Sequence, residues 1–231
     1  MPSGTYNFSP SLGSLGAYAF GRCGIRRPAI TVDHLADLGM AANLVLADWG
    51  NSTPNLWLMS LGSISLVQGT PTYTLPATVT LVTDVYITTN VGSPPPTDRV
   101  LFPASRSEYA AFPNKLLQSP PTTWWFNRVL PPQISVYPTA DGNGPYTLNY
   151  WAVHQDQDAV VGGATGLDLP GRFLMAFVDA IAVELAASYA PDRAQALFAK
   201  AQQSIERARE QDREDVTFFL TPGLASYYRQ T

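Results

Sequence analysis

Two aspartates are the residues of this sequence that come closest to a catalytic pair. Asp156 and Asp158 flank Gln157 in a polar segment that follows a predicted strand. A glycosidase uses two carboxyl groups at a set separation, one of which is kept protonated by burial. The polar composition of residues 155–166 predicts an exposed loop. An acid in such a loop stays in water, so burial does not raise its pKa. We expect the two aspartates to lie in a solvated turn or to line a channel. The enzymatic alternative is that they hydrolyse peptidoglycan.

The remaining residues give little support for a cofactor-binding or metal-binding site. The glycine-rich residues 162–166 lack the lysine of a phosphate-binding loop. The chain has one cysteine, Cys23, and two histidines far apart, His34 and His154. A single cysteine forms no intrachain disulfide and no CxxC metal pair. We therefore expect no cofactor and no metal, with Cys23 as a small core residue.

A run of aromatic residues offers a stacking surface. Trp124, Trp125 and Phe126 are adjacent in a predicted strand, and aromatic faces stack on bases or sugars. Successive side chains of a strand point to opposite faces, so Trp124 and Phe126 share one face and Trp125 lies on the other. This predicts core packing plus one interface, with a ligand-binding module as the alternative.

Charged residues concentrate near the C-terminus. Arg207, Arg209 and Arg213 interleave with acids at helical spacing, which is typical of a solvated helix face and also suits an electrostatic contact with a neighbour. Arg26 and Arg27 precede Pro28, where they end a helix; two cations give little affinity for DNA phosphates. Among the acids, Glu184 stands alone on an apolar helix and is expected to be partly buried.

The composition favours self-assembly. Hydrophobic residues make up 45% of the 231 residues and charged residues only 14%, and charges are depleted at interface cores. The net charge of −4 argues against a protein that grips nucleic acid by its phosphates. The N-terminal residues lack the pattern of a signal peptide, and no segment is typical of a membrane helix. We expect a soluble protein made in a cytoplasm, without a membrane partner.

Helical periodicity occupies both ends of the chain. The N-terminal helices cover residues 14–23 and 32–49, with Thr31 as N-cap of the second. The C-terminal helices cover 172–190 and 192–215, separated at Pro191. The predicted buried stripes are Val32, Leu35, Leu38, Ala42, Val45, Leu46 and Trp49 in the second helix, Phe173, Ala176, Phe177, Ala180, Val183 and Ala187 in the third, and Ala194, Leu197, Phe198, Ala201 and Ile205 in the fourth.

Between the helices the pattern alternates as in strands. Residues 56–153 predict about six to eight strands, enough for a small sandwich or barrel. Ser105 and Glu108 have the spacing of a capping box and predict a short helix. Residues 141–144, Asp-Gly-Asn-Gly, predict a hairpin between strands 133–137 and 146–153.

These elements predict an α+β fold in two parts. The helices at both ends form one bundle, residues 1–52 and 167–231, which ends in an extended C-terminal tail. Residues 53–166 form an inserted antiparallel β-sandwich or barrel.

In this order the segments resemble the podovirus-type phage head-to-tail adaptor family, also called tail tubular protein A or packaged-DNA stabilisation protein. The resemblance covers nearly the whole chain. It rests on residues 43–49 (Asn-Leu-Val-Leu-Ala-Asp-Trp), Leu56-Trp57, Tyr73-Thr74-Leu75, residues 105–109 (Ser-Arg-Ser-Glu-Tyr), residues 120–125 (Pro-Pro-Thr-Thr-Trp-Trp), residues 134–138 (Ile-Ser-Val-Tyr-Pro) and Leu169-Pro170.

The resemblance implies a structural, non-enzymatic role in the virion neck. Family members form a twelve-subunit ring under the portal protein, extend the channel through which double-stranded DNA passes, and carry tail or nozzle proteins. The chain would be assembled in the host cytoplasm, and a virion-associated peptidoglycan hydrolase is the alternative. The expected contact residues are the aromatic end, Phe218, Phe219, Leu220, Tyr227 and Tyr228, the arginines Arg207, Arg209 and Arg213, and the small residues Ala182 and Ala186.

Overall fold

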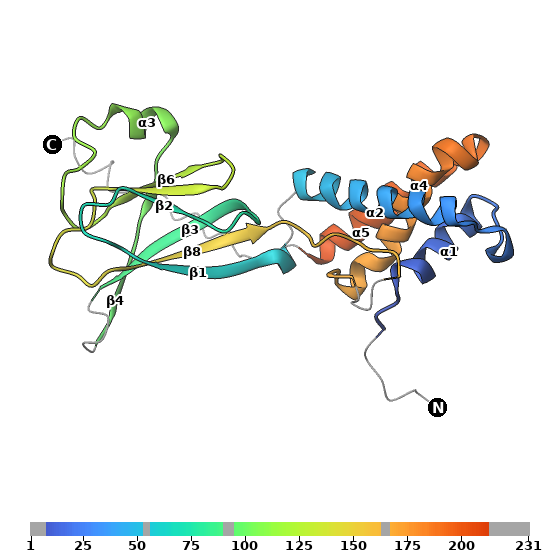
Figure 1. The fold of residues 1–231 in the computed structure, drawn as a ribbon, viewed down its shortest axis with the longest axis horizontal. Coiled ribbons are helices and arrows are strands. Elements are labelled where there is room, and N and C mark those ends of the chain that lie inside the picture. Colours follow the sequence, from blue (N-terminus) through green and yellow to red (C-terminus); the bar gives the residue numbers. More distant parts are fainter. Residues whose placement is uncertain (1–7, 53–55, 90–94, 163–166, 213–231) are drawn as a thin grey trace, which may run out of the picture.

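The computed structural model describes residues 8–52, 56–89, 95–162 and 167–212. Four helices gather at one end of an elongated molecule, and the strands with one short helix form the other end (Figure 1). The chain is therefore a mixed α+β protein, as predicted. The helices are α1 (Leu12–Arg22), α2 (Val32–Ser52), α3 (Arg106–Ala111), α4 (Leu174–Tyr189) and α5 (Ala194–Gln211). The strands are β1 (Met59–Ser65), β2 (Thr72–Thr74), β3 (Val79–Thr89), β4 (Thr97–Val100), β5 (Phe102–Pro103), β6 (Thr123–Asn127), β7 (Gln133–Tyr137) and β8 (Thr147–His154).

Helices α1, α2, α4 and α5 share one hydrophobic core. Helix α4 is central and contacts each of the other three, which explains why nearly all of its residues are apolar. Phe177 and Ile181 of α4 are fully buried, together with Phe20 of α1 and Leu38 of α2. Segments from the two ends of the chain therefore form this core.

Three residues of the predicted apolar stripes are exposed. Val32 is 80% exposed because it is the first residue of α2, before the helix reaches its packed face. Ala187 is exposed near the end of α4. Phe198 lies at the margin of the buried face of α5 and is 54% exposed. The expectation that these side chains are buried was wrong.

The strands form two four-stranded sheets with the orders β1-β8-β3-β4 and β2-β7-β6-β5. All pairs are antiparallel except the short pair β5 and β6, which is parallel. A second hydrophobic core takes side chains from both sheets, including Ile87, Ile134 and Leu148. It has no residue in common with the helical core.

Four connections pass from one sheet to the other, and two of them differ from the sequence prediction. Strands β4 and β5 flank the buried Leu101 and belong to different sheets, whereas the apolar residues from Arg99 to Phe102 read in the sequence as one continuous run. Residues 141–144 likewise lead from β7 to β8, which do not pair, so the predicted hairpin was wrong. The Asp141 carboxylate accepts hydrogen bonds from the Asn143 backbone N–H and the Tyr146 hydroxyl, and these contacts form a corner between sheets.

The short helix α3 begins with the predicted capping box. The Ser105 hydroxyl accepts a hydrogen bond from the Glu108 backbone N–H at 3.1 Å, and the Glu108 carboxylate accepts one from the Ser105 N–H at 2.6 Å. Both bonds satisfy donors that a helix start leaves unpaired. They also lower the pKa of Glu108, because they stabilise its charged form.

Candidate interaction surfaces

The aromatic contact residues predicted from the sequence lie outside the described part of the chain. So does Arg213, whereas Arg207 and Arg209 lie on α5. Arg207 is exposed and Arg209 is partly buried. The residues outside the described ranges are Arg213, Phe218, Phe219, Leu220, Tyr227 and Tyr228.

Ala182 and Ala186 are buried in the chain's own helical core. Neither side chain is exposed, and both belong to the cluster formed by α1, α2, α4 and α5. The carbonyl oxygen of Ala182 accepts a weak hydrogen bond at 3.5 Å from the thiol of Cys23, the residue that follows α1. The close helix packing expected of these alanines therefore takes place within one chain, and a neighbouring subunit does not reach their side chains.

A buried acid lies between α1, α4 and α5. The side chain of Asp179 is only 1% exposed and forms ion pairs with Arg22 of α1 and Lys200 of α5. Arg22 is also largely buried, with 17% of its side chain exposed. We expected Glu184 to be the partly buried acid of this helix, but it is exposed. The isolated acid at position 179 was the same kind of signal, but only packing shows which acid faces inward.

An open apolar groove lies on the other side of α5, between α2 and α5 with α4 as its floor. Its volume is about 160 Å³. Leu44 of α2 and Phe198 of α5 face it and are about half exposed, at 53% and 54%. Asp48 and Glu184 also line it. Glu184 therefore contributes to a surface and not to the core.

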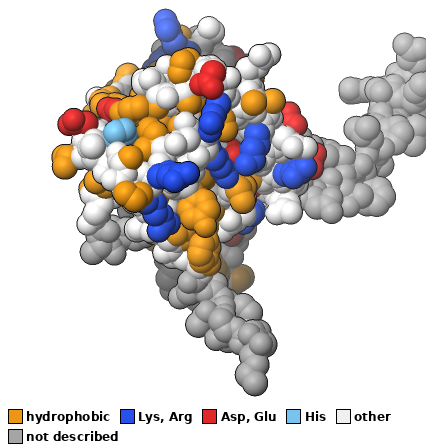
Figure 2. Space-filling model, turned by 90° about the vertical axis from the view of Figure 1, so that its right-hand side faces the viewer, with side chains coloured by type: hydrophobic (Ala, Val, Ile, Leu, Met, Phe, Trp, Pro, Cys, Tyr) orange, Lys and Arg blue, Asp and Glu red, His pale blue; other side chains and the backbone are white. Residues whose placement is uncertain are grey.

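The end of the molecule formed by the four helices combines positive charge with apolar area. Figure 2 shows Lys and Arg side chains gathered across the middle of this end, with hydrophobic side chains next to them. Arg26, Arg27, Arg193 and Lys200 are exposed residues of the helical part. Arg26 and Arg27 are adjacent in the sequence, whereas Arg193 and Lys200 come from the distant region of α5.

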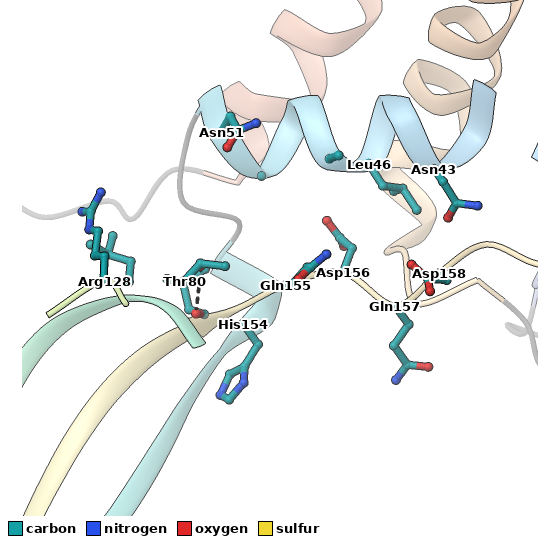
Figure 3. A pocket seen from close by; sticks show the side chains of 14 residues that line it. Asn43, Leu46, Asn51, Thr80, Arg128, His154, Gln155, Asp156, Gln157 and Asp158 are labelled. Atoms are coloured by element: carbon teal, nitrogen blue, oxygen red, sulfur yellow. Dashed lines mark hydrogen bonds between the residues drawn. The ribbon is translucent and has the colours of Figure 1, made fainter. Parts of the chain in front are cut away.

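Asp156 and Asp158 lie at a hollow of about 490 Å³ between α2 and the β8 end of the nearby sheet. In Figure 3 the Asp156 side chain points toward α2, whereas Gln157 and His154 point away from it. Asp156 is partly buried and Asp158 is exposed. A hydrolytic carboxyl pair needs one acid held out of water; the exposed Asp158 does not meet this condition, and the partly buried Asp156 meets it only in part.

Asn43 joins α2 to the segment that follows β8. Its side-chain amide donates to the carbonyl oxygens of Gly39 and Ala159 at 2.9 and 3.1 Å. Its side-chain oxygen accepts from the Ala159 N–H at 2.8 Å. These two hydrogen bonds satisfy both the N–H and the C=O of Ala159. They hold the segment after β8 against α2, beside the hollow. In the sequence, Asn43 is marked only as part of the segment 43–49 that carries the family resemblance.

The aromatic run of β6 is used inside the chain. Trp124 is buried in the second core and Phe126 packs against the same core, while Trp125 lies on the opposite face, as the alternation predicted. Trp125 stacks on Tyr109 of α3 with ring centroids 5.1 Å apart. Helix α3 thus covers part of the surface that a stacked ligand would need.

The cysteine and the histidines occupy separate packed positions. Cys23 is buried in the helical core as predicted, and burial raises the pKa of its thiol. His34 contacts the Thr31 hydroxyl at 2.6 Å and stacks on Tyr189, whose hydrogen bond to Asp37 raises the pKa of the phenol. Within the described ranges, no three His, Cys, Asp or Glu side chains converge as metal ligands would.

None of the described helices is both long enough and apolar enough to span a membrane.

Comparison with known proteins gives one family. No protein with curated annotation matches the chain. The sequence model of a family described as SU10 adaptor protein matches residues 24–224, which include α2, all the strands and the C-terminal helices α4 and α5 but not α1. The chain therefore belongs to the SU10 adaptor protein family, a family of phage adaptors.

Proposed function

We propose that this chain is the subunit of a ring that connects the portal of a tailed phage to its tail. Membership of the SU10 adaptor family over residues 24–224 carries this proposal. Following the resemblance to podovirus-type head-to-tail adaptors, the ring has twelve subunits and surrounds the channel for double-stranded DNA. Its lower side carries tail or nozzle proteins, and the assembly belongs to the virion neck.

The proposed subunit has two parts with different tasks. Residues 1–52 and 167–231 form the helical bundle with its tail, and residues 53–166 form an inserted β-sandwich. Support comes from the two hydrophobic cores, which share no residue, and from the elongated arrangement in Figure 1. The exposed cations and apolar side chains at the helical end suit contacts with other proteins (Figure 2).

We assign portal binding to the C-terminal residues from Val216 onward, because Phe218, Phe219 and Leu220 are apolar and α5 ends at Gln211. A chain truncated after Asp215 should lose binding to purified portal in a pull-down assay. A matched variant that keeps the length but replaces Phe218, Phe219 and Leu220 with serine should behave in the same way. Unchanged binding by both variants would refute this assignment.

The role itself is tested in the virion. Electron microscopy of the neck should show a ring beneath the portal into which this fold fits, and virions lacking the polypeptide at that vertex would overturn the proposal. A monomeric state of the purified chain would not refute the ring, since subunits of this kind can stay monomeric until they bind the portal. A lytic assay on peptidoglycan separates the adaptor from the hydrolase alternative, and we expect no activity.

A further inference from the structure

We propose that the two sides of α5 form a head-to-tail contact between neighbouring copies of this chain. The side next to α1 carries Arg22, Arg193, Lys200 and Arg207 and is called the cationic flank. The side next to α2 carries Leu44, Phe198, Glu184 and Glu206 and is called the acidic groove. The inference rests on the proposed ring, since it names the surfaces that join its subunits.

The cationic flank follows from the spacing along α5. Arg193, Lys200 and Arg207 are seven residues apart, which is close to two helical turns, so they lie on one side of the helix. All three are exposed. The Arg193 guanidinium donates to the Arg22 carbonyl oxygen at 3.3 Å, which places Arg22 beside them.

Two acids near this flank, Asp179 and Asp192, do little to neutralise the charge of its outer surface. Asp179 pairs with Arg22 and Lys200 but is 1% exposed, so its charge lies beneath the surface. Asp192 approaches Arg193 only to 4.0 Å, and both side chains are mostly exposed. Such an exposed pair is weak and leaves the guanidinium available to a partner. Arg207 forms no ion pair with any other described residue.

The acidic groove has an apolar floor with carboxylates at its edge. Leu44 and Phe198 expose about half of their side chains to a groove of about 160 Å³. Glu184 lines the groove. Glu206 lies eight residues after Phe198, about 80° around α5 from it, at the outer edge of this side, and is exposed. Arg209, which is partly buried, lies further along this side and offsets part of the charge.

The cationic flank also presents an apolar side chain. Met175 of α4 is 60% exposed, and its sulfur lies 3.2 Å from the Arg22 guanidinium. Each surface therefore has an apolar centre bordered mainly by charge of one sign, the arrangement of a stable interface. Met175 of one copy suits the groove of the next copy, where it would cover Phe198 and Leu44.

The signs of the charges decide how two copies meet. A two-fold contact through either surface alone would place like charges opposite each other, which opposes association. A contact between the cationic flank of one copy and the acidic groove of the next pairs opposite charges. Such a contact uses different surfaces on the two copies, and repetition of it closes a ring when the rotation allows.

Cysteine crosslinking tests the contact in the full-length chain. Met175→Cys and Phe198→Cys, combined in one chain, should give a ladder of covalent multimers with a short bismaleimide, in virions and in concentrated purified protein. Each single variant should remain monomeric on the same gel, and Cys23 gives little background because it is buried. Dimers from either single variant, or the absence of a ladder from the double variant, would overturn the inference.

Charge reversal provides an independent measurement. Arg207→Glu or Glu184→Arg alone should weaken subunit association by about tenfold or more, and the two changes together should restore it. Arg106→Glu, an exposed change on α3 in the β-rich part, is the control and should leave association unchanged. If virions carry the ring but neither effect is seen, the contact is wrong and the ring stands. If virions lack the polypeptide, the proposed function itself fails.

Discussion

The buried carboxylate of Asp179 holds three helices together. Its side chain pairs with Arg22, which is largely buried, and with the half-exposed Lys200. Removal of one partner from a buried ion pair leaves an uncompensated charge, so Asp179→Ala should lower the free energy of unfolding by about 3 kcal/mol. Lys200→Met should cost less than about 1 kcal/mol, because exposed pairs contribute little. Urea titrations measure both, and equal effects would contradict this account.

Asp141 links a single hydrogen bond to the stability of the β-rich part at acidic pH. The Tyr146 hydroxyl donates to its carboxylate at 2.8 Å, and this bond is the main cause that lowers the pKa of Asp141. A lowered folded-state pKa stabilises the protein above the ordinary aspartate range, and this stability is lost as pH falls through the folded value. The stabilisation is therefore present at neutral pH.

Tyr146→Phe should raise the pKa of Asp141 toward its ordinary value. The carboxyl resonance of Asp141, followed by nuclear magnetic resonance from pH 2 to 6 with the usual carboxylate range in view, measures the shift. Tyr150→Phe is the matched control, since that buried phenol has a pKa raised by desolvation alone and makes no bond to Asp141. If the Asp141 titration is unchanged in Tyr146→Phe, the hydrogen bond does not control it.

At the level of elements, Asn43 connects α2 with the segment after β8. Asn43→Ala removes the partner of both backbone groups of Ala159, so we expect a loss of about 2 kcal/mol. The Ala159 amide should also exchange its hydrogen faster. Asn51→Ala, an exposed change at the same hollow, should stay within about 0.5 kcal/mol. Unchanged exchange at Ala159 would show that the amide pair does not hold this segment.

Elements that depend only on residues close together in the sequence can be predicted from it. The capping box of Ser105 and Glu108 and the bounds of β7 were predicted correctly, because each depends on residues a few positions apart. The corner at Asp141 was not predicted correctly. The turn residues 141–144 suit both a hairpin and a connection between two sheets. Only the partners of β7 and β8, which lie far away in the sequence, decide between them.

The candidate surfaces are harder to predict for the same reason. A lone acid in an apolar helix indicates a buried partner, but α4 offers Asp179 and Glu184 as two such acids. Asp179 is the acid that faces inward, where it pairs with Arg22 and Lys200; helix packing brings these two cations from α1 and α5. The seven-residue spacing of the cations on α5 was visible in the sequence, whereas the groove beside Phe198 depends on how α2 meets α5.

For the whole molecule, two hydrophobic cores without a common residue predict two unfolding units. Leu38 in the helical core and Leu148 in the β-rich core are both fully buried, so each change to Ala should cost about 3 kcal/mol. Hydrogen exchange of peptides from both parts during a urea titration distinguishes the units. Leu38→Ala should shift the transition of the helical peptides, and Leu148→Ala that of the β-rich peptides. One common transition, shifted equally by both changes, would mean that the inserted strands and the helical bundle fold as a single unit, against the proposed division of the subunit.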